Sequence, residues 1–180
     1  MQSLPILSRQ FVRALLIMVL LGSPTGAQAQ DHEHTTPESP ALAKIKTLVG
    51  EWVAVGEDGK PTEEIVSVYR ETAGGSAIHE TLFPGQPHEM ITLYYQDGDD
   101  LVLTHYCVLG NQPRMKANAP SSDKITFEFA GGANIKPETD AHMHQGIVRF
   151  LDENTIESEW TQWTDGKPSE VVKLKLARKQ

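Results

Sequence analysis

From Gly50 to the C-terminus, apolar and polar side chains alternate in short runs, and a turn signal recurs about every ten residues. Alternation with a period of two is typical of β-strands with one buried face, and no window after Leu48 keeps a helical period over three turns. The turn signals are Gly74-Gly75, Pro84-Gly85, Asp97-Gly98, Gly131-Gly132 and Asp165-Gly166. Asp-Gly between alternating runs is typical of tight hairpins, so we expect neighbouring strands to pair antiparallel.

These turns divide the chain into ten expected strands. They lie near residues 50–56, 63–72, 76–83, 88–96, 100–108, 112–118, 123–130, 142–151, 154–163 and 169–178. A short helix is expected before them over residues 41–48, where Leu42, Ile45 and Leu48 are spaced three apart. The pattern predicts an all-β meander that closes into an antiparallel up-and-down β-barrel, with a sandwich as the alternative.

The first 29 residues have the order of a secretory signal peptide. Arg9 and Arg13 precede a short apolar run, and Ala27 and Ala29 supply the small residues of a cleavage site. The run is shorter than the ~20 apolar residues that cross a bilayer, so we expect a periplasmic or secreted protein whose mature chain has no transmembrane segment. A signal anchor is the alternative. A disordered tether is expected over residues 30–40, and a single barrel domain is expected over residues 41–180.

Cleavage after Ala29 would place His32 third in the mature chain. A free amine followed by histidine at the third position suits square-planar Cu²⁺ or Ni²⁺. The alternative interpretation is a polar tail without a metal.

Composition excludes several classes of partner. The chain carries 24 acidic and 16 basic residues, which gives a net charge of −8. Nucleic acids and anionic lipid surfaces both need clustered Lys and Arg, so neither is expected as a partner. Cys107 is the one cysteine, which excludes an intrachain disulfide and a cysteine-rich zinc module. The fold must therefore depend on its core.

The expected hairpins assign some side chains to faces. Across the Asp97-Gly98 turn, one face is expected to hold Met90, Thr92, Tyr94, Leu101, Leu103, His105 and Cys107. On the strand over 142–151, Gln145 and Arg149 mark the solvent side. The inward side there is expected to hold His142, His144, Gly146, Val148 and Phe150. The pairs His79-Glu80 and His88-Glu89 flank the Pro84-Gly85 turn and are expected to be partly exposed.

The segment Leu48-Val49-Gly50-Glu51-Trp52 resembles the opening of lipocalin-like (calycin) barrels. In that family the tryptophan closes the narrow end and a late arginine covers it, which implies these roles for Trp52 and Arg178. Ten strands without a terminal helix are more similar to nitrobindin-like and fatty-acid-binding-protein-like members. The segment over 105–115 resembles exported bacterial lipocalin-like domains of unknown function. Nitrobindin-like proteins hold haem through a histidine near the C-terminus, and no histidine follows His144, which argues against haem.

A binding barrel needs a few polar groups at an apolar cavity. The candidate ligand contacts are His88, Tyr94, His105, Tyr106, Arg114, His142, His144 and Trp160. The histidines and Arg114 would fix a polar group of the ligand, and the aromatic residues would form walls. A satisfied core histidine and an acid/base are the alternatives for His105, and a solvated surface charge is the alternative for Arg114.

The motif His142-x-His144 places two imidazoles side by side on a strand, which suits two ligands of one Zn²⁺. His105 would be the third ligand, with His88 or Glu80 as other choices, and polar lining of the barrel mouth is the alternative. Three functions follow: binding of a small hydrophobic or amphiphilic molecule, a metal-dependent enzyme using His105, His142 and His144, or a side-chain-filled barrel that acts as an envelope interaction module. No motif identifies a reaction, so we favour binding and assign no catalytic residue. The sequence does not predict the oligomeric state.

Overall fold

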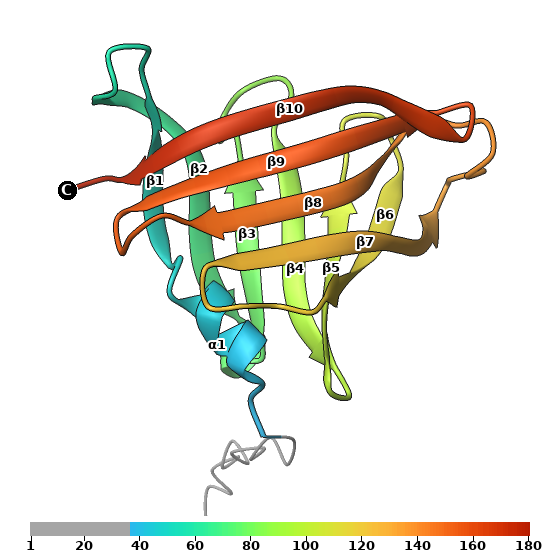
Figure 1. Ribbon diagram of the computed structural model, residues 1–180, viewed down its shortest axis with the longest axis horizontal. Coiled ribbons are helices and arrows are strands. Elements are labelled where there is room, and N and C mark those ends of the chain that lie inside the picture. Colours follow the sequence, from blue (N-terminus) through green and yellow to red (C-terminus); the bar gives the residue numbers. More distant parts are fainter. Residues whose placement is uncertain (1–36) are drawn as a thin grey trace, which may run out of the picture. The chain divides into compact units, whose positions relative to one another are not determined.

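The computed structural model describes residues 37–180, which form a closed barrel of ten antiparallel strands (Figure 1). The strands are β1 (Gly50–Val55), β2 (Pro61–Thr72), β3 (Ala77–Leu82), β4 (Met90–Asp97), β5 (Asp100–Tyr106), β6 (Gln112–Asn118), β7 (Lys124–Ala133), β8 (His142–Phe150), β9 (Thr155–Thr164) and β10 (Lys167–Arg178). Each strand pairs with the next along the chain, and β10 pairs with β1 to close the barrel. The predicted up-and-down barrel is confirmed, and the expected signal peptide and His32 lie outside the described residues.

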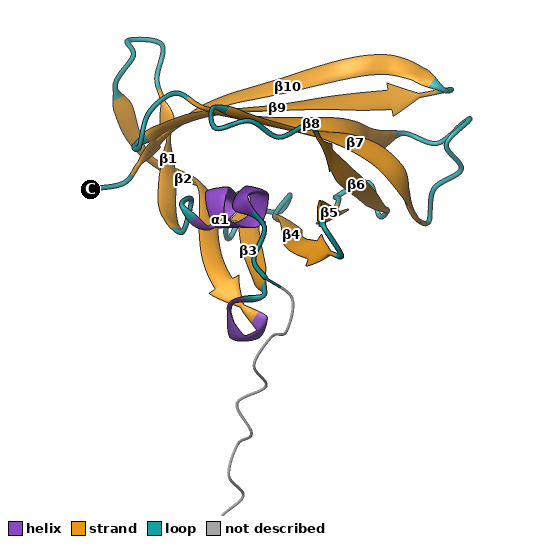
Figure 2. Ribbon diagram, turned by 60° about the horizontal axis from the view of Figure 1, so that its bottom comes forward, coloured by secondary structure: helices purple, strands orange, loops and turns teal. Residues whose placement is uncertain are grey.

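A short helix, α1 (Pro40–Lys46), precedes the barrel as predicted. The Ser39 side chain accepts a hydrogen bond from the Leu42 N–H at 3.2 Å, and Pro40 occupies the first turn, where its missing N–H costs nothing. Leu42 and Ile45 are buried in the core, and Figure 2 shows α1 lying between strands of opposite sides of the barrel. The helix therefore closes one end. Within residues 37–180, no helix has the length and apolar character needed to cross a membrane.

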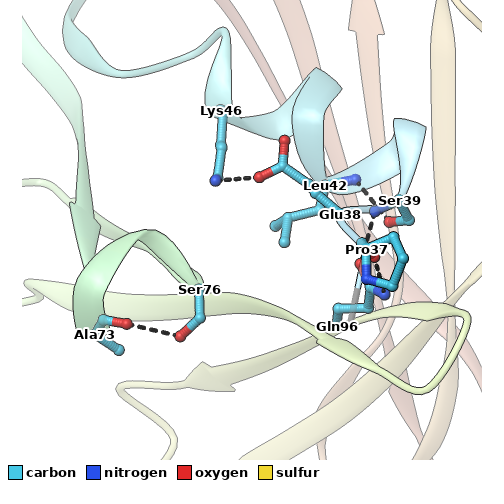
Figure 3. A network of polar contacts seen from close by, with 8 residues as sticks. All are labelled: Pro37, Glu38, Ser39, Leu42, Lys46, Ala73, Ser76 and Gln96. Carbon is cyan, nitrogen blue, oxygen red and sulfur yellow. Dashed lines mark hydrogen bonds and ion pairs between the residues drawn. The ribbon is translucent and has the colours of Figure 1, made fainter. Parts of the chain in front are cut away.

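The segment before α1 is attached to Gln96, near the end of β4 (Figure 3). The Ser39 N–H donates to Gln96 Oε1 at 2.7 Å, and Gln96 Nε2 donates to the Pro37 carbonyl at 3.0 Å. Lys46 and Glu38 form an ion pair beside these contacts. These contacts hold residues 37–39, the last described part of the predicted tether, against the barrel.

Trp52 and Arg178 meet at the same end of the barrel, because they are directly paired between β1 and β10. The indole N–H of Trp52 donates to the Leu48 carbonyl at 2.7 Å, and the ring is almost fully buried. The Arg178 guanidinium lies 4.5 Å from the ring centroid and donates to the carbonyls of Thr47 and Val49 at 2.6 and 2.8 Å. These contacts join the last strand to the first strand and to the loop after α1.

Large side chains fill much of the barrel. One buried cluster includes Trp52, Tyr69, Tyr94 and Phe127 together with the apolar side of α1. The ring centroids of Tyr94 and Phe127 are 5.7 Å apart, and those of Tyr69 and Tyr94 are 6.4 Å apart. Small barrels are commonly filled in this way, so a ligand can only occupy the space that these side chains leave.

Candidate functional site

The inner face of β4 and β5 is the face predicted from the Asp97-Gly98 turn. Thr92 pairs with His105, and Tyr94 pairs with Leu103. All four side chains are buried, so the predicted shared face is confirmed and it faces the barrel interior. Cys107 follows β5, and burial raises the pKa of its thiol.

An apolar pocket of about 250 Å³ lies against this inner face. Its lining side chains come from six strands and the β3–β4 loop: Leu82, Phe83, Met90, His105, Met143, Trp160, Val172 and Leu174. Trp160 and His105 are the two lining residues with polar side-chain atoms, and the Trp160 indole N–H donates to Ser158 Oγ at 2.9 Å. The imidazole of His105 is therefore the side-chain polar group that a molecule in this pocket would meet.

Larger hollows of about 640 and 760 Å³ flank α1. Charged side chains border both of them, among them Lys44 and Arg178 in the first and Lys46 and Glu71 in the second. We place the candidate site in the smaller pocket because an apolar cavity with few polar groups is the usual form of a small-molecule site.

His105 is held at the pocket by two contacts. Its Nδ1 lies 3.0 Å from Thr92 Oγ1, and its ring lies 5.1 Å from that of Trp160. Burial lowers its pKa from 6.5 to about 4, so the ring is neutral at neutral pH. Within residues 37–180, His105 Nε2 has no hydrogen-bond partner. Only Asn111 Oδ1 is both fully enclosed and without a partner there, so His105 Nε2 is not fully enclosed. His105 lines the pocket and its Nδ1 is turned to Thr92, so Nε2 is the ring nitrogen that stays available there.

Glu80 lies on β3, two strands from His105. It is almost fully buried, with 2% of its surface exposed. The prediction that this residue is a partly exposed loop end is wrong, because it shares the inward face of β3 with Ile78 and Leu82. Its carboxylate accepts hydrogen bonds from Ser67 Oγ at 2.6 Å and from the Tyr94 hydroxyl at 2.7 Å.

Within residues 37–180, the partners of this buried acid are hydroxyl groups and not cations. Burial raises the pKa of Glu80, and hydrogen bonds from Ser67, Tyr69, Tyr94 and Thr92 act in the opposite direction. Burial next to Glu80 in turn raises the pKa of both Tyr69 and Tyr94 well above 10.0, so both phenols remain protonated donors.

His142 and His144 form a separate aromatic cluster. His142 Nε2 lies 3.0 Å from His144 Nδ1, and His142 Nδ1 lies 2.8 Å from the Asp140 carbonyl oxygen. The His144 ring stacks on Trp163 with centroids 3.7 Å apart, and Phe129 contacts both imidazoles. Burial and His142 lower the pKa of His144.

A register shift between Met143 and Gln145 explains why these histidines are not in the pocket. One extra residue in β8 interrupts the alternation of faces, as a β-bulge does. The expected inward series from His142 to Phe150 is therefore broken, and Met143 lines the pocket where a regular strand would present a histidine.

The structure does not gather His105, His142 and His144 around one point. Among residues 37–180, no group of three or more His, Cys, Asp or Glu side chains is arranged to hold a metal ion. Both ring nitrogens of His142 already have partners, and His105 Nδ1 faces Thr92. This donor set does not fit zinc, so we derive no chemistry through a metal.

The other predicted ligand contacts lie around or outside the pocket. His88 is exposed and contacts Phe83, which lines the pocket, with ring centroids 4.7 Å apart. Tyr94 lies in the filled core, and Tyr106 is on the outer face with 46% of its surface exposed. Arg114 also faces outward and forms an ion pair with Asp97 at 2.6 Å. Of the predicted contacts, His105 and Trp160 line the pocket itself.

No protein-family model matches this chain, and no curated protein matches it. The predicted lipocalin-like resemblance is supported at the level of a closed antiparallel barrel of ten strands. Function is therefore inferred from the geometry of the pocket.

Proposed function

We propose that the protein is an exported barrel that binds a small, largely apolar molecule in the pocket beside His105. The observation that carries this proposal is the pocket itself: an apolar hollow that offers the imidazole of His105 as its available side-chain polar group. Small-molecule sites are typically concave and mostly apolar, with a few polar groups that fix the ligand. A hollow of about 250 Å³ in a barrel that is otherwise well filled supports occupation by a ligand.

The size of the pocket limits what it can hold. An apolar cavity of roughly 150 Å³ accommodates benzene, and sites for drug-sized molecules begin at roughly 300 Å³. At about 250 Å³, this pocket suits a molecule with one or two rings or a short acyl chain. A full-length fatty acid does not fit the described cavity.

Export is proposed from the signal-like order of residues 1–29. A metal-dependent enzyme receives no support from the positions of His105, His142 and His144. The filled-barrel alternative makes a different prediction from ours, because a barrel that acts only through its surface would bind no small molecule inside.

Calorimetric titration with toluene tests the proposal. Leu174→Trp places an indole in the pocket, and we expect it to weaken toluene binding at least tenfold. Val171→Trp is the matched control because Val171 lies on the same strand, is half exposed and does not line the pocket, so its affinity should equal that of the unmodified protein. Absence of toluene binding to the unmodified protein, or equal loss in the two variants, would contradict the proposal.

A further inference from the structure

Four polar side chains form a row across four neighbouring strands on the inner side of the barrel, and the row ends at the pocket. The strand register pairs Tyr69 with Glu80, Glu80 with Thr92, and Thr92 with His105. Directly opposed residues on antiparallel strands project to the same face. The four side chains therefore lie next to one another, one each on β2, β3, β4 and β5. All four are buried, and His105 is the member that lines the pocket.

The hydrogen bonds of this row converge on Glu80. The two carboxylate oxygens of Glu80 receive hydrogen bonds from Ser67 and Tyr94, and the hydroxyls of Tyr69 and Thr92 also hydrogen-bond to this side chain. A threonine hydroxyl has a single proton. Thr92 is the cross-strand neighbour of Glu80, and a carboxylate attracts a hydroxyl proton more strongly than a neutral imidazole does. With its proton directed to Glu80, Thr92 Oγ1 accepts from His105 Nδ1, which lies 3.0 Å away.

This direction determines what His105 offers to a ligand. A neutral imidazole carries one proton, and with that proton on Nδ1 the other nitrogen is a hydrogen-bond acceptor. His105 lines the pocket and Nε2 is its available ring nitrogen, so the pocket presents an acceptor in apolar surroundings. The lining residues include no Lys or Arg that would compensate a ligand carboxylate, and burying an unpaired charge is costly.

We infer that the pocket recognises an uncharged molecule with a hydroxyl group on a small apolar body, such as a simple phenol, which donates its proton to His105 Nε2. This inference rests on the proposed function and specifies its ligand class. Glu80 and Thr92 are positioning residues here, because they act on the ligand only by fixing the proton of His105.

The proton position is tested first, by a long-range ¹H–¹⁵N spectrum of His105 in the full protein at pH 7.5. We expect the proton on Nδ1. Thr92→Val keeps the shape of the side chain and removes the hydroxyl, so this preference should disappear in that variant. A proton on Nε2 in the unmodified protein would overturn the inference.

Titrations with phenol, toluene and benzoate test the ligand class. Phenol and toluene have nearly the same shape, so the ratio of their affinities isolates the hydroxyl group. His105→Leu should leave toluene binding in place and weaken phenol relative to toluene roughly fivefold, which is the value of one ordinary hydrogen bond. Benzoate should bind at least tenfold more weakly than phenol.

The outcomes separate this inference from the proposed function. Toluene binding with an unchanged phenol-to-toluene ratio in His105→Leu, or benzoate binding as tight as that of phenol, would overturn the ligand class and leave the pocket a binding site. Failure of toluene itself to bind the unmodified protein would overturn the proposed function. Toluene binding to His105→Leu also shows that this variant is folded.

Discussion

Two buried titratable groups give this barrel opposite responses to pH. Burial lowers the pKa of His105 to about 4, so between pH 6.5 and about 4 the unfolded chain binds more protons at this residue than the native protein does. Its contribution to stability is therefore lost as the pH falls through that range. Burial raises the pKa of Glu80, so the native protein holds this proton more tightly, and that contribution is lost as the pH rises through the raised value.

The His105 contribution is measured by comparing the unmodified protein with His105→Leu. Between pH 7 and pH 4 the free energy of unfolding of the unmodified protein should fall by about 3 kcal/mol relative to the variant. Urea unfolding across this range gives both profiles, and the comparison cancels the effect of Glu80 and of surface carboxylates. Parallel profiles would mean that His105 is not buried as a neutral ring.

Arg178 is a second residue whose contacts have a measurable value. Arg178→Lys keeps the charge but removes the two-pronged contact with the carbonyls of Thr47 and Val49 and the flat packing on Trp52. We expect a loss of about 1–2 kcal/mol in the free energy of unfolding. The control is Lys179→Ala, which breaks the exposed ion pair with Glu51 and should cost less than about 0.5 kcal/mol. Equal losses in the two variants would contradict this role.

At the scale of elements, α1 is stabilised chiefly by its buried side. Ile45 is fully buried in the core cluster, whereas nearby Val49 is 39% exposed. Ile45→Ala should lower the free energy of unfolding by about 3 kcal/mol, since it removes a buried side chain and leaves a cavity. Val49→Ala should change it by less than about 1 kcal/mol. Chemical unfolding of both variants tests this role of α1. If the helix were only attached to the barrel and did not close it, the two variants would lower the free energy of unfolding equally.

The sequence predicts the strands well because alternation and Asp-Gly turns are local signals. The turn at Asp97-Gly98 alone places Thr92 opposite His105, and the structure confirms that pair. The extra residue in β8 is different, because a bulge is defined by how Met143 and Gln145 pair with β9, and the apolar pattern within β8 does not show that pairing. Regular alternation is right for Gly146 and Val148, which are buried, and wrong before the bulge, where Met143 lines the pocket.

Glu80 shows a signal that sequence reasoning missed. Its neighbours two positions away, Ile78 and Leu82, are apolar, and alternation alone would place all three on the buried face. Charge argued for exposure, because an acidic residue is seldom fully buried without a partner. The partners are hydroxyl groups of Ser67, Tyr69, Thr92 and Tyr94 on neighbouring strands, and only the strand register brings these together.

At the scale of the whole molecule, the barrel combines an end closed by α1, a filled core with a buried acid, and an apolar pocket. A ligand that binds only the folded protein raises its stability by mass action. At ten times the dissociation constant, toluene should add about 1.4 kcal/mol and raise Tm by roughly 3–6 °C. Calorimetric unfolding should show this shift in Val171→Trp and not in Leu174→Trp, and a shift common to both would indicate binding elsewhere.

The most direct test of the central claim locates toluene on the protein. Intermolecular nuclear Overhauser effects should connect toluene with the methyl groups of Met90, Met143 and Leu174, which line the pocket. Met115 serves as an internal control, because it is fully buried in the filled core and does not line the pocket, so it should show no such effect. Effects confined to the exposed side chains of Val108 and Leu109 would contradict the account by placing toluene on the surface.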